Sequence, residues 1–231
     1  MIPAGTFLMG ATDLSWATPV HPVTFTSAFE MDKYEVTVAA YQACEDAGWL
    51  GCTPPAILDD CNSGVLGREL YPINCIDWNQ TKAYCNWVGK RLCSESEWEY
   101  AARGSEGRLY PWGNEIATCE YAVMDDGSGD GCGTGLAWQV GSKAAGATPE
   151  GVMDMAGNML EWVEDDYHET YADAPANGNP WIDIPRASMR MLRGGGFFDG
   201  DSYQRSSGRN TAAGPSGIIG FHIGGRCCRS L

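Results

Sequence analysis

Hydrophobic positions near the N-terminus follow first the pattern of strands and then that of a helix. In residues 21–44, HPVTFTSAFEMDKYEVTVAAYQAC, apolar and polar residues alternate at the start and later take helical spacing. Alternation is typical of a strand with one buried face, whereas a period of about 3.6 residues is typical of an amphipathic helix. This stretch therefore predicts strand structure followed by a helix.

Two helices with clear end signals are predicted in the middle of the chain. In residues 75–91, CIDWNQTKAYCNWVGKR, Asp77 can cap the N-terminus and Gly89 stands where a left-handed C-terminal cap is needed. In residues 94–107, SESEWEYAARGSEG, Ser94 and Glu97 have the spacing of a capping box, and Gly104 ends the helix. The apolar faces would be formed by Trp78, Ala83, Tyr84 and Trp87 in the first helix and by Trp98, Ala101 and Ala102 in the second.

Beyond residue 105 the pattern predicts short strands, turns and long loops, with no internal repeat or linker. The 231 residues contain 30 glycines and 12 prolines, which favour turns over long helices. Two central helices and a loop-rich second half predict a mixed α+β fold in a single domain, residues 1–231.

Charge and hydropathy limit the classes of partner. The net charge is -15, so the surface repels nucleic acid and anionic lipid, and we expect neither nucleic-acid binding nor membrane insertion. No stretch approaches the roughly 20 apolar residues that span a bilayer. The start, MIPAGTFLMG, lacks the basic region of a signal peptide.

Ten cysteines are the strongest compositional signal. No pair has C-x-x-C spacing and only three histidines are present, so a zinc site is not expected. Disulfides are the favoured interpretation, and they indicate an oxidising compartment, with an extracellular or cell-surface location suspected. Cys119 and Cys132 flank an Asp/Gly loop and could pair. Several free buried thiols are the alternative.

Several phrases in order resemble the formylglycine-generating, sulfatase-modifying-factor family: IPAGTFLMG, DKYEVTVAAY, YPINCIDWNQTKAYCNWVGKRL, SEWEYAARG, YPWGNE, VMDMAGNMLEWV and LRGGGFF. They span nearly the whole chain. The resemblance implies a loop-rich C-type-lectin-like fold of α+β class with short antiparallel strands and structural calcium.

The same resemblance implies that the family's oxidase activity is absent here. The aerobic enzyme binds copper through two cysteines after an RGGS motif, and the matching positions here are Asp199 and Gln204, with Gly196 in place of the serine. Without thiolates we expect no copper and no catalytic residue. Cys227 and Cys228 are not replacements, because neighbours on a strand point to opposite faces.

The resemblance also implies a calcium site in DMAGNMLE. The ligands would be the carboxylates of Asp154 and Glu161 and the carbonyls of Gly157 and Met159, a set of hard oxygens that suits Ca²⁺. The alternative is that Glu161 only caps a turn. A second site near Asp126 and Asp130 stays open, because Val123 stands where the family has an asparagine.

The C-terminal segment has a narrow residue vocabulary. Between Phe197 and His222, Trp, Met, Lys and Glu are absent and Tyr, Ser, Gly, Asn, Asp and Phe dominate, as in adaptable binding surfaces. This resembles the variable proteins of diversity-generating retroelements, and implies a variable segment over 193–226. The predicted contact residues are Phe197, Phe198, Asp199, Asp201, Tyr203, Asn210, Thr211, Gly217, Ile218, Ile219, Phe221 and His222.

Three functional hypotheses follow. The favoured one is a monomeric, non-catalytic protein that binds a protein or cell-surface ligand through this segment. A divergent formylglycine-generating-type oxidoreductase and a structural pseudoenzyme domain are the alternatives. Four arginines are expected to belong to the scaffold and to bind acidic residues or backbone carbonyls: Arg193, Arg205, Arg209 and Arg226.

Overall fold

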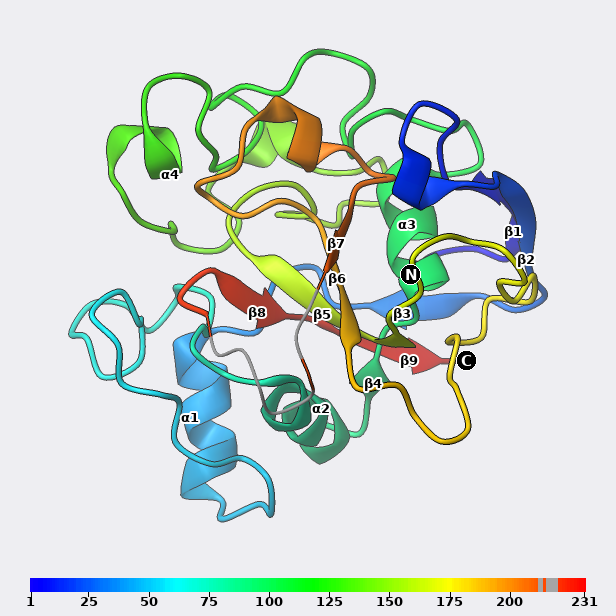
Figure 1. The fold of residues 1–231 in the computed structure, drawn as a ribbon. Coiled ribbons are helices and arrows are strands. Elements are labelled where there is room, and N and C mark those ends of the chain that lie inside the picture. The colour runs from blue at the N-terminus through cyan, green and yellow to red at the C-terminus, as the bar shows by residue number, and fades with distance from the viewer. Residues whose placement is uncertain (212–213, 215–219) are drawn as a thin grey trace.

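The computed structural model describes residues 1–211, 214 and 220–231. Short strands and a few helices are connected by long loops (Figure 1). The helices are α1 (Val38–Asp46), α2 (Trp78–Trp87), α3 (Glu95–Arg103) and the single turn α4 (Asp130–Gly133), with 3-10 turns η1 (Ser15–Ala17), η2 (Ala144–Gly146) and η3 (Asp201–Gln204). The predicted α+β class is confirmed.

The strands form three small sheets. A hairpin joins β1 (Gly5–Met9) to β2 (His21–Phe25), and a second sheet has the order β3 (Phe29–Met31), β9 (Cys227–Ser230), β4 (Arg91–Leu92). The third has the order β7 (Arg209–Thr211), β6 (Arg190–Arg193), β5 (Leu160–Asp166), β8 (Ile223–Gly225). The expectation of antiparallel strands holds except for β5 and β8, which are parallel.

Capping fixes the helix starts where the sequence predicts them. In α2, Gln80 N donates to Asp77 Oδ1 at 2.8 Å, and Asp77 N donates to Gln80 Oε1 at 2.7 Å. The predicted capping box of α3 is present between Ser94 and Glu97. Gly89 and Gly104 follow the two helices with φ of 72° and 63°, a region that favours glycine. In α2 the sequence predicts the cap at Asp77, and the structure adds the reciprocal bond to Gln80.

The two chain ends lie close together in Figure 1 because both pair with β3. Ile2 forms a bridge with Phe29, and Phe29 pairs with Ser230 of β9. Above this sheet, α3 buries Trp98, and the largest apolar cluster gathers residues from β1, β2, β3 and α3. Across the described ranges, no helix combines the length and hydropathy that a bilayer span requires.

Candidate ligand-binding face

Three buried arginines fix the backbone of the predicted variable segment, Arg193 and Arg226 at its two ends and Arg209 of β7 within it. Arg193 Nη2 is 2.7 Å from Glu99 Oε2, Arg209 Nε is 2.7 Å from Glu95 Oε1, and Arg226 Nε is 2.8 Å from Glu161 Oε2. Each arginine is at most 8 % exposed. Although burial disfavours the charge, Glu95 keeps the pKa of Arg209 above its usual value. The expected scaffold role of these arginines is confirmed.

Arg205 also binds an acidic residue, as expected, but at the surface. Arg205 Nη1 is 2.8 Å from Asp13 Oδ2, and the Asp13 side chain is 65 % exposed. Such a pair contributes little to stability, because water screens it.

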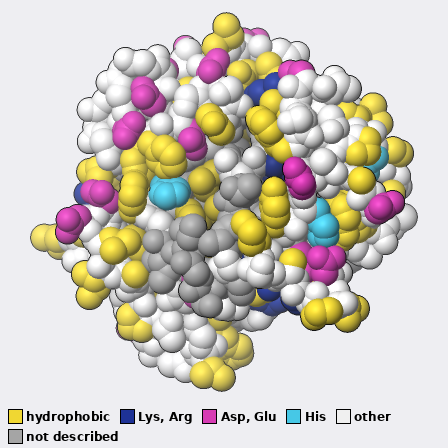
Figure 2. All heavy atoms as spheres, in the orientation of Figure 1, with side chains coloured by type: hydrophobic (Ala, Val, Ile, Leu, Met, Phe, Trp, Pro, Cys, Tyr) yellow, Lys and Arg dark blue, Asp and Glu magenta, His cyan; other side chains and the backbone are white. Residues whose placement is uncertain are grey.

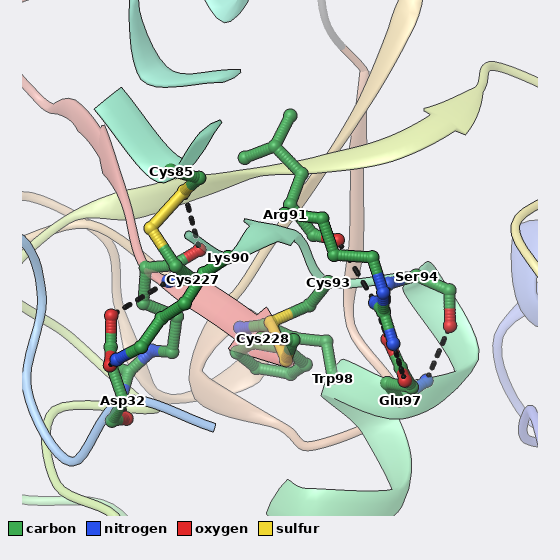
Figure 3. Close-up of a disulfide and its surroundings, with 12 residues drawn as sticks. Asp32, Cys85, Lys90, Arg91, Cys93, Ser94, Glu97, Trp98, Cys227 and Cys228 are labelled. Atoms are coloured by element: carbon green, nitrogen blue, oxygen red, sulfur yellow. Dashed lines mark hydrogen bonds and ion pairs between the residues drawn. A yellow bond between two sulfur atoms is a disulfide. The ribbon is translucent and has the colours of Figure 1, made fainter. Parts of the chain in front are cut away.

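Two disulfides hold β9, the strand that follows the predicted variable segment (Figure 3). Cys227 bonds to Cys85 of α2, and its neighbour Cys228 bonds to Cys93, which precedes α3. The partners lie on opposite faces of β9, as the alternation of a strand requires. The predicted Cys119–Cys132 bond is present, together with Cys44–Cys52 and Cys61–Cys75. All ten cysteines are paired, so the alternative of free thiols is wrong, and the five disulfides indicate an oxidising environment.

The loop before η3 meets the residues before β8, and there Phe198, Phe221 and His222 form an aromatic group. The Phe198 and His222 ring centroids are 4.8 Å apart, and those of Phe221 and His222 are 5.0 Å apart. Phe198, Phe221 and His222 are partly exposed, whereas Phe197 beneath them is 3 % exposed. The expectation that Phe197 offers contact surface is therefore wrong: its ring supports Phe198 and Phe221 from below.

The positions matching the copper cysteines hold their own loop together by hydrogen bonds. Gly196 N donates to Asp199 Oδ2 at 2.8 Å, and Gln204 Nε2 donates to the carbonyls of Gly196 and Asp199 at 3.3 and 3.1 Å. Gln204 is fully buried and Asp199 is partly exposed. Burial raises the pKa of Asp199, the Gly196 bond opposes this, and Asp130 adds to it. The amide and carboxylate stabilise the loop, and neither is a soft ligand for copper.

Tyr203 lies at a pocket of about 540 Å³ that is built from distant parts of the chain. Trp16 and Tyr203 line this pocket and are 45 % and 50 % exposed, and Tyr167 and Glu169 from the segment after β5 line it as well. Arg209 forms part of the floor, with its donors bound to Glu95 and the Trp16 carbonyl. Sequence reasoning missed Trp16 and Tyr167, because no local pattern shows that these segments meet.

The remaining predicted contact residues have mixed positions. Asp201 is exposed in η3, and Asn210 lines the pocket while its Nδ2 donates to the Gly194 carbonyl at 2.9 Å. The backbone of Thr211 belongs to β7. Gly217, Ile218 and Ile219 lie outside the described residues.

The turn expected to bind calcium is buried and rich in carboxylates. Glu161 binds Arg226 and accepts a 2.7 Å hydrogen bond from Trp98 Nε1, while Asp154 Oδ2 accepts one from Gly141 N at 2.6 Å. Glu35, which the sequence did not single out, binds Met159 N at 3.0 Å and Asn158 Nδ2 at 2.6 Å. Burial, then Asp154 and Glu161, raise the pKa of Glu35 well above its usual value.

This buried cluster has three carboxylates and one guanidinium, so its charge is not balanced when all are ionised. A divalent cation bound by hard oxygens would correct the imbalance, and in that respect the residues fit calcium. In the described part of the chain, no three acidic, histidine or cysteine side chains converge as a metal site on their own. The carbonyls of Gly157 and Met159 would therefore have to complete the coordination.

In the acidic loop at the second candidate calcium site, near Asp126 and Asp130, the carboxylates accept hydrogen bonds from the backbone of the loop itself. Asp126 accepts hydrogen bonds from Cys119 N and from the Ser128 hydroxyl, and Asp125 accepts them from Gly127 N and Gly129 N. These are the bonds of a plain acidic turn.

Comparison with known proteins places the chain in a family. The profile of the sulfatase-modifying factor enzyme 1-like domain matches residues 1–231. The formylglycine-generating enzyme of Streptomyces coelicolor is 34 % identical over 176 residues, which are 71 % of this chain and 55 % of that protein. The chain thus spans little more than half the length of this relative.

Two solved structures share the fold. PvdO from Pseudomonas aeruginosa superimposes with a TM-score of 0.85 at 30 % identity, covering 99 % of this chain and 92 % of PvdO. Treponema denticola variable protein 1 superimposes with a TM-score of 0.78 at 21 % identity, covering 100 % of this chain and 94 % of that one. The chain therefore belongs to the sulfatase-modifying factor enzyme 1-like family.

Proposed function

We propose that this chain is a non-catalytic ligand-binding protein that displays a diversified C-terminal surface on a rigid scaffold. One observation carries the proposal: Arg193, Arg209 and Arg226 are buried in ion pairs, while Asp201 and Tyr203 between them are exposed. The strands are fixed at their buried positions, so side chains in the connecting loops can change without loss of the core.

The aromatic group and the pocket are the two parts of this face that offer contact area. Phe198, Phe221 and His222 supply partly exposed rings, and Trp16 and Tyr203 border a pocket that is large enough for a side chain or a small ligand. Aromatic residues contribute much contact area at low cost in conformational entropy, so they suit a surface that must recognise different ligands.

The fold shared with Treponema denticola variable protein 1 supports a display role, and the absence of thiolates at positions 199 and 204 supports the loss of copper chemistry. Five disulfides fit an extracellular or cell-surface location, where we propose that a monomer meets a protein or cell-surface ligand. Structural calcium, held by Asp154 and Glu161 with the carbonyls of Gly157 and Met159, is part of the same proposal.

The proposal is tested by comparing substitutions at displayed and buried positions of one segment. Tyr203→Ser should change the free energy of unfolding by less than about 0.5 kcal/mol, whereas Phe197→Ser should cost about 3–5 kcal/mol. Urea denaturation measures both. A large loss of stability with Tyr203→Ser would show that the segment is core and not a display surface.

The retroelement origin is tested on the DNA beside the gene. We expect a near-copy of the coding segment for residues 193–226, differing mostly at adenines, next to a reverse transcriptase gene. Flanking DNA without such a copy would favour a structural pseudoenzyme domain that recognises one fixed partner.

A divergent oxidoreductase is the second candidate, because the chain is 34 % identical to a formylglycine-generating enzyme and the pocket adjoins Tyr203, next to the matched position Gln204. Purified protein should neither bind Cu(I) nor convert the cysteine of a sulfatase-type peptide. Turnover of that peptide would replace the binding proposal with the enzymatic one.

A further inference from the structure

The loop between α1 and α2 exposes an unusual amount of aliphatic surface. Ile57 and Leu66 are 98 % and 96 % exposed, and Leu58, Val65 and Leu70 are also exposed. The Cys61–Cys75 disulfide closes this loop, and Asn62 is bound inside it through Asn74 and the Pro72 carbonyl. Single exposed aliphatic residues are common, but here five occur within 14 residues, three of them in the part closed by the disulfide, and such a concentration is typical of an interaction surface.

A groove of about 490 Å³ separates this loop from α1. Ala39, Ala43 and Asp46 form the helix side, and Val65, Leu66 and Glu69 form the loop side. The helix residues follow at intervals of four and three, so they share one face of α1. The groove thus has small and branched apolar side chains within it and one carboxylate on each side.

The charges around the groove are acidic and not neutralised by described residues. Asp46 accepts a hydrogen bond from Gln42, and Glu69 accepts one from Gly67 N, but neither forms an ion pair in the described part of the chain. The nearby Arg68 is instead bound to Asn62 and lies over the Tyr71 ring. Figure 2 shows the same character over the visible face, where acidic side chains lie between hydrophobic groups and basic ones are few.

We propose that this groove is a fixed docking surface for a basic amphipathic segment of a partner protein. Apolar side chains of such a segment would cover Val65 and Leu66, and its lysines or arginines would meet Asp46 and Glu69. An anionic lipid surface is a poor match, since the chain carries a net charge of -15. The groove lies outside residues 193–226 and does not depend on variation there.

The loop is also joined to the variable segment. Asn74 Nδ2 donates to the Phe221 carbonyl at 2.6 Å, and Cys75 N donates to the Gly220 carbonyl at 3.2 Å. The C-terminal end of the loop is therefore held against the aromatic group by hydrogen bonds.

The test uses two fluorescently labelled amphipathic helical peptides. One is made of leucine and lysine and the other of leucine and glutamate, and fluorescence anisotropy measures the binding of each to the intact chain. The lysine peptide should bind and the glutamate peptide should not. Leu66→Ser with Glu69→Gln should weaken the lysine peptide by about tenfold or more, because an apolar contact and a charge are both removed. Ile116→Ser with Glu120→Gln is the matched control, since both residues are exposed on a different loop.

Equal weakening by the two double variants would show that the peptide binds only through overall charge, and would overturn the proposal. So would preferential binding of the chain to phosphatidylcholine vesicles through Ile57 and Leu66. A Phe221→Ser variant distinguishes this groove from the variable face: unchanged binding of the lysine peptide leaves the groove proposal intact whatever happens to the proposed function.

Discussion

Arg209 of β7 and Glu95 of α3 form a buried ion pair, with 2.7 Å between Nε and Oε1. The same carboxylate accepts a hydrogen bond from the Tyr171 hydroxyl at 3.0 Å and lies 3.4 Å from Arg193 Nη1. Arg209 in turn donates to the Trp16 carbonyl at 2.6 Å. One side chain thus ties β7, in the middle of the C-terminal segment, to α3 and to the N-terminal loop that borders the pocket.

Arg209→Met should cost about 3–5 kcal/mol of unfolding free energy, because it leaves Glu95 buried with less compensation. Arg229→Met is the control, since its pair with Glu30 is at the surface, with side chains 52 % and 34 % exposed, and should cost less than about 1 kcal/mol. Urea denaturation measures both. Similar losses for the two variants would contradict the structural role given to Arg209.

The neighbouring disulfides Cys85–Cys227 and Cys93–Cys228 should be strongly coupled. Each disulfide alone closes a loop of more than 130 residues. When one is already present, the other closes only a short loop, made of the segment from Cys85 to Cys93 and the adjacent pair Cys227 and Cys228. Replacing either pair with alanine should therefore cost about 2.5 kcal/mol, and replacing both about 7 kcal/mol. A double-mutant cycle by urea denaturation measures the coupling, and strictly additive losses would argue against this entropic account.

His222 should make stability depend on pH. Burial lowers the pKa of His222, so the unfolded chain binds the proton more readily than the folded one. The contribution of the neutral ring to the free energy of unfolding is therefore complete above about pH 6.5, and it is lost as the pH falls toward the pKa of His222 in the folded state. His222→Phe should lessen the fall in unfolding free energy between about pH 7 and 5, and an unchanged pH profile would exclude this residue as its cause.

Calcium should stabilise the fold through the turn at residues 154–161. Adding CaCl₂ should raise the melting temperature, and a chelator should reverse the rise, because binding to the folded state alone favours it by mass action. Asp154→Asn should abolish the response. Asp126→Asn is the control in the acidic loop and should leave it intact, whereas loss of the response with Asp126→Asn alone would move the site to that loop.

Local signals gave the helices but not the site. Asp77 and Ser94 mark the starts of α2 and α3 because a cap acts on backbone groups two or three residues away. The pocket could not be predicted, because Trp16, Tyr167 and Tyr203 come from three distant segments whose meeting depends on the packing of β7 and α3. Phe197 and Phe198 are adjacent in sequence, and only the fold decides that one is buried and the other partly exposed.

The sequence by itself determined the fold class, the capped helices and the lack of copper thiolates, since these depend on residue type, local spacing and the order of motifs. The tertiary structure decided which cysteines pair, that Gln204 binds its own loop, and that Glu35 joins Asp154 and Glu161 around Arg226. Those contacts join residues up to 142 positions apart, from Cys85 to Cys227, and no local pattern encodes them. Their geometry depends on the simultaneous packing of the whole chain.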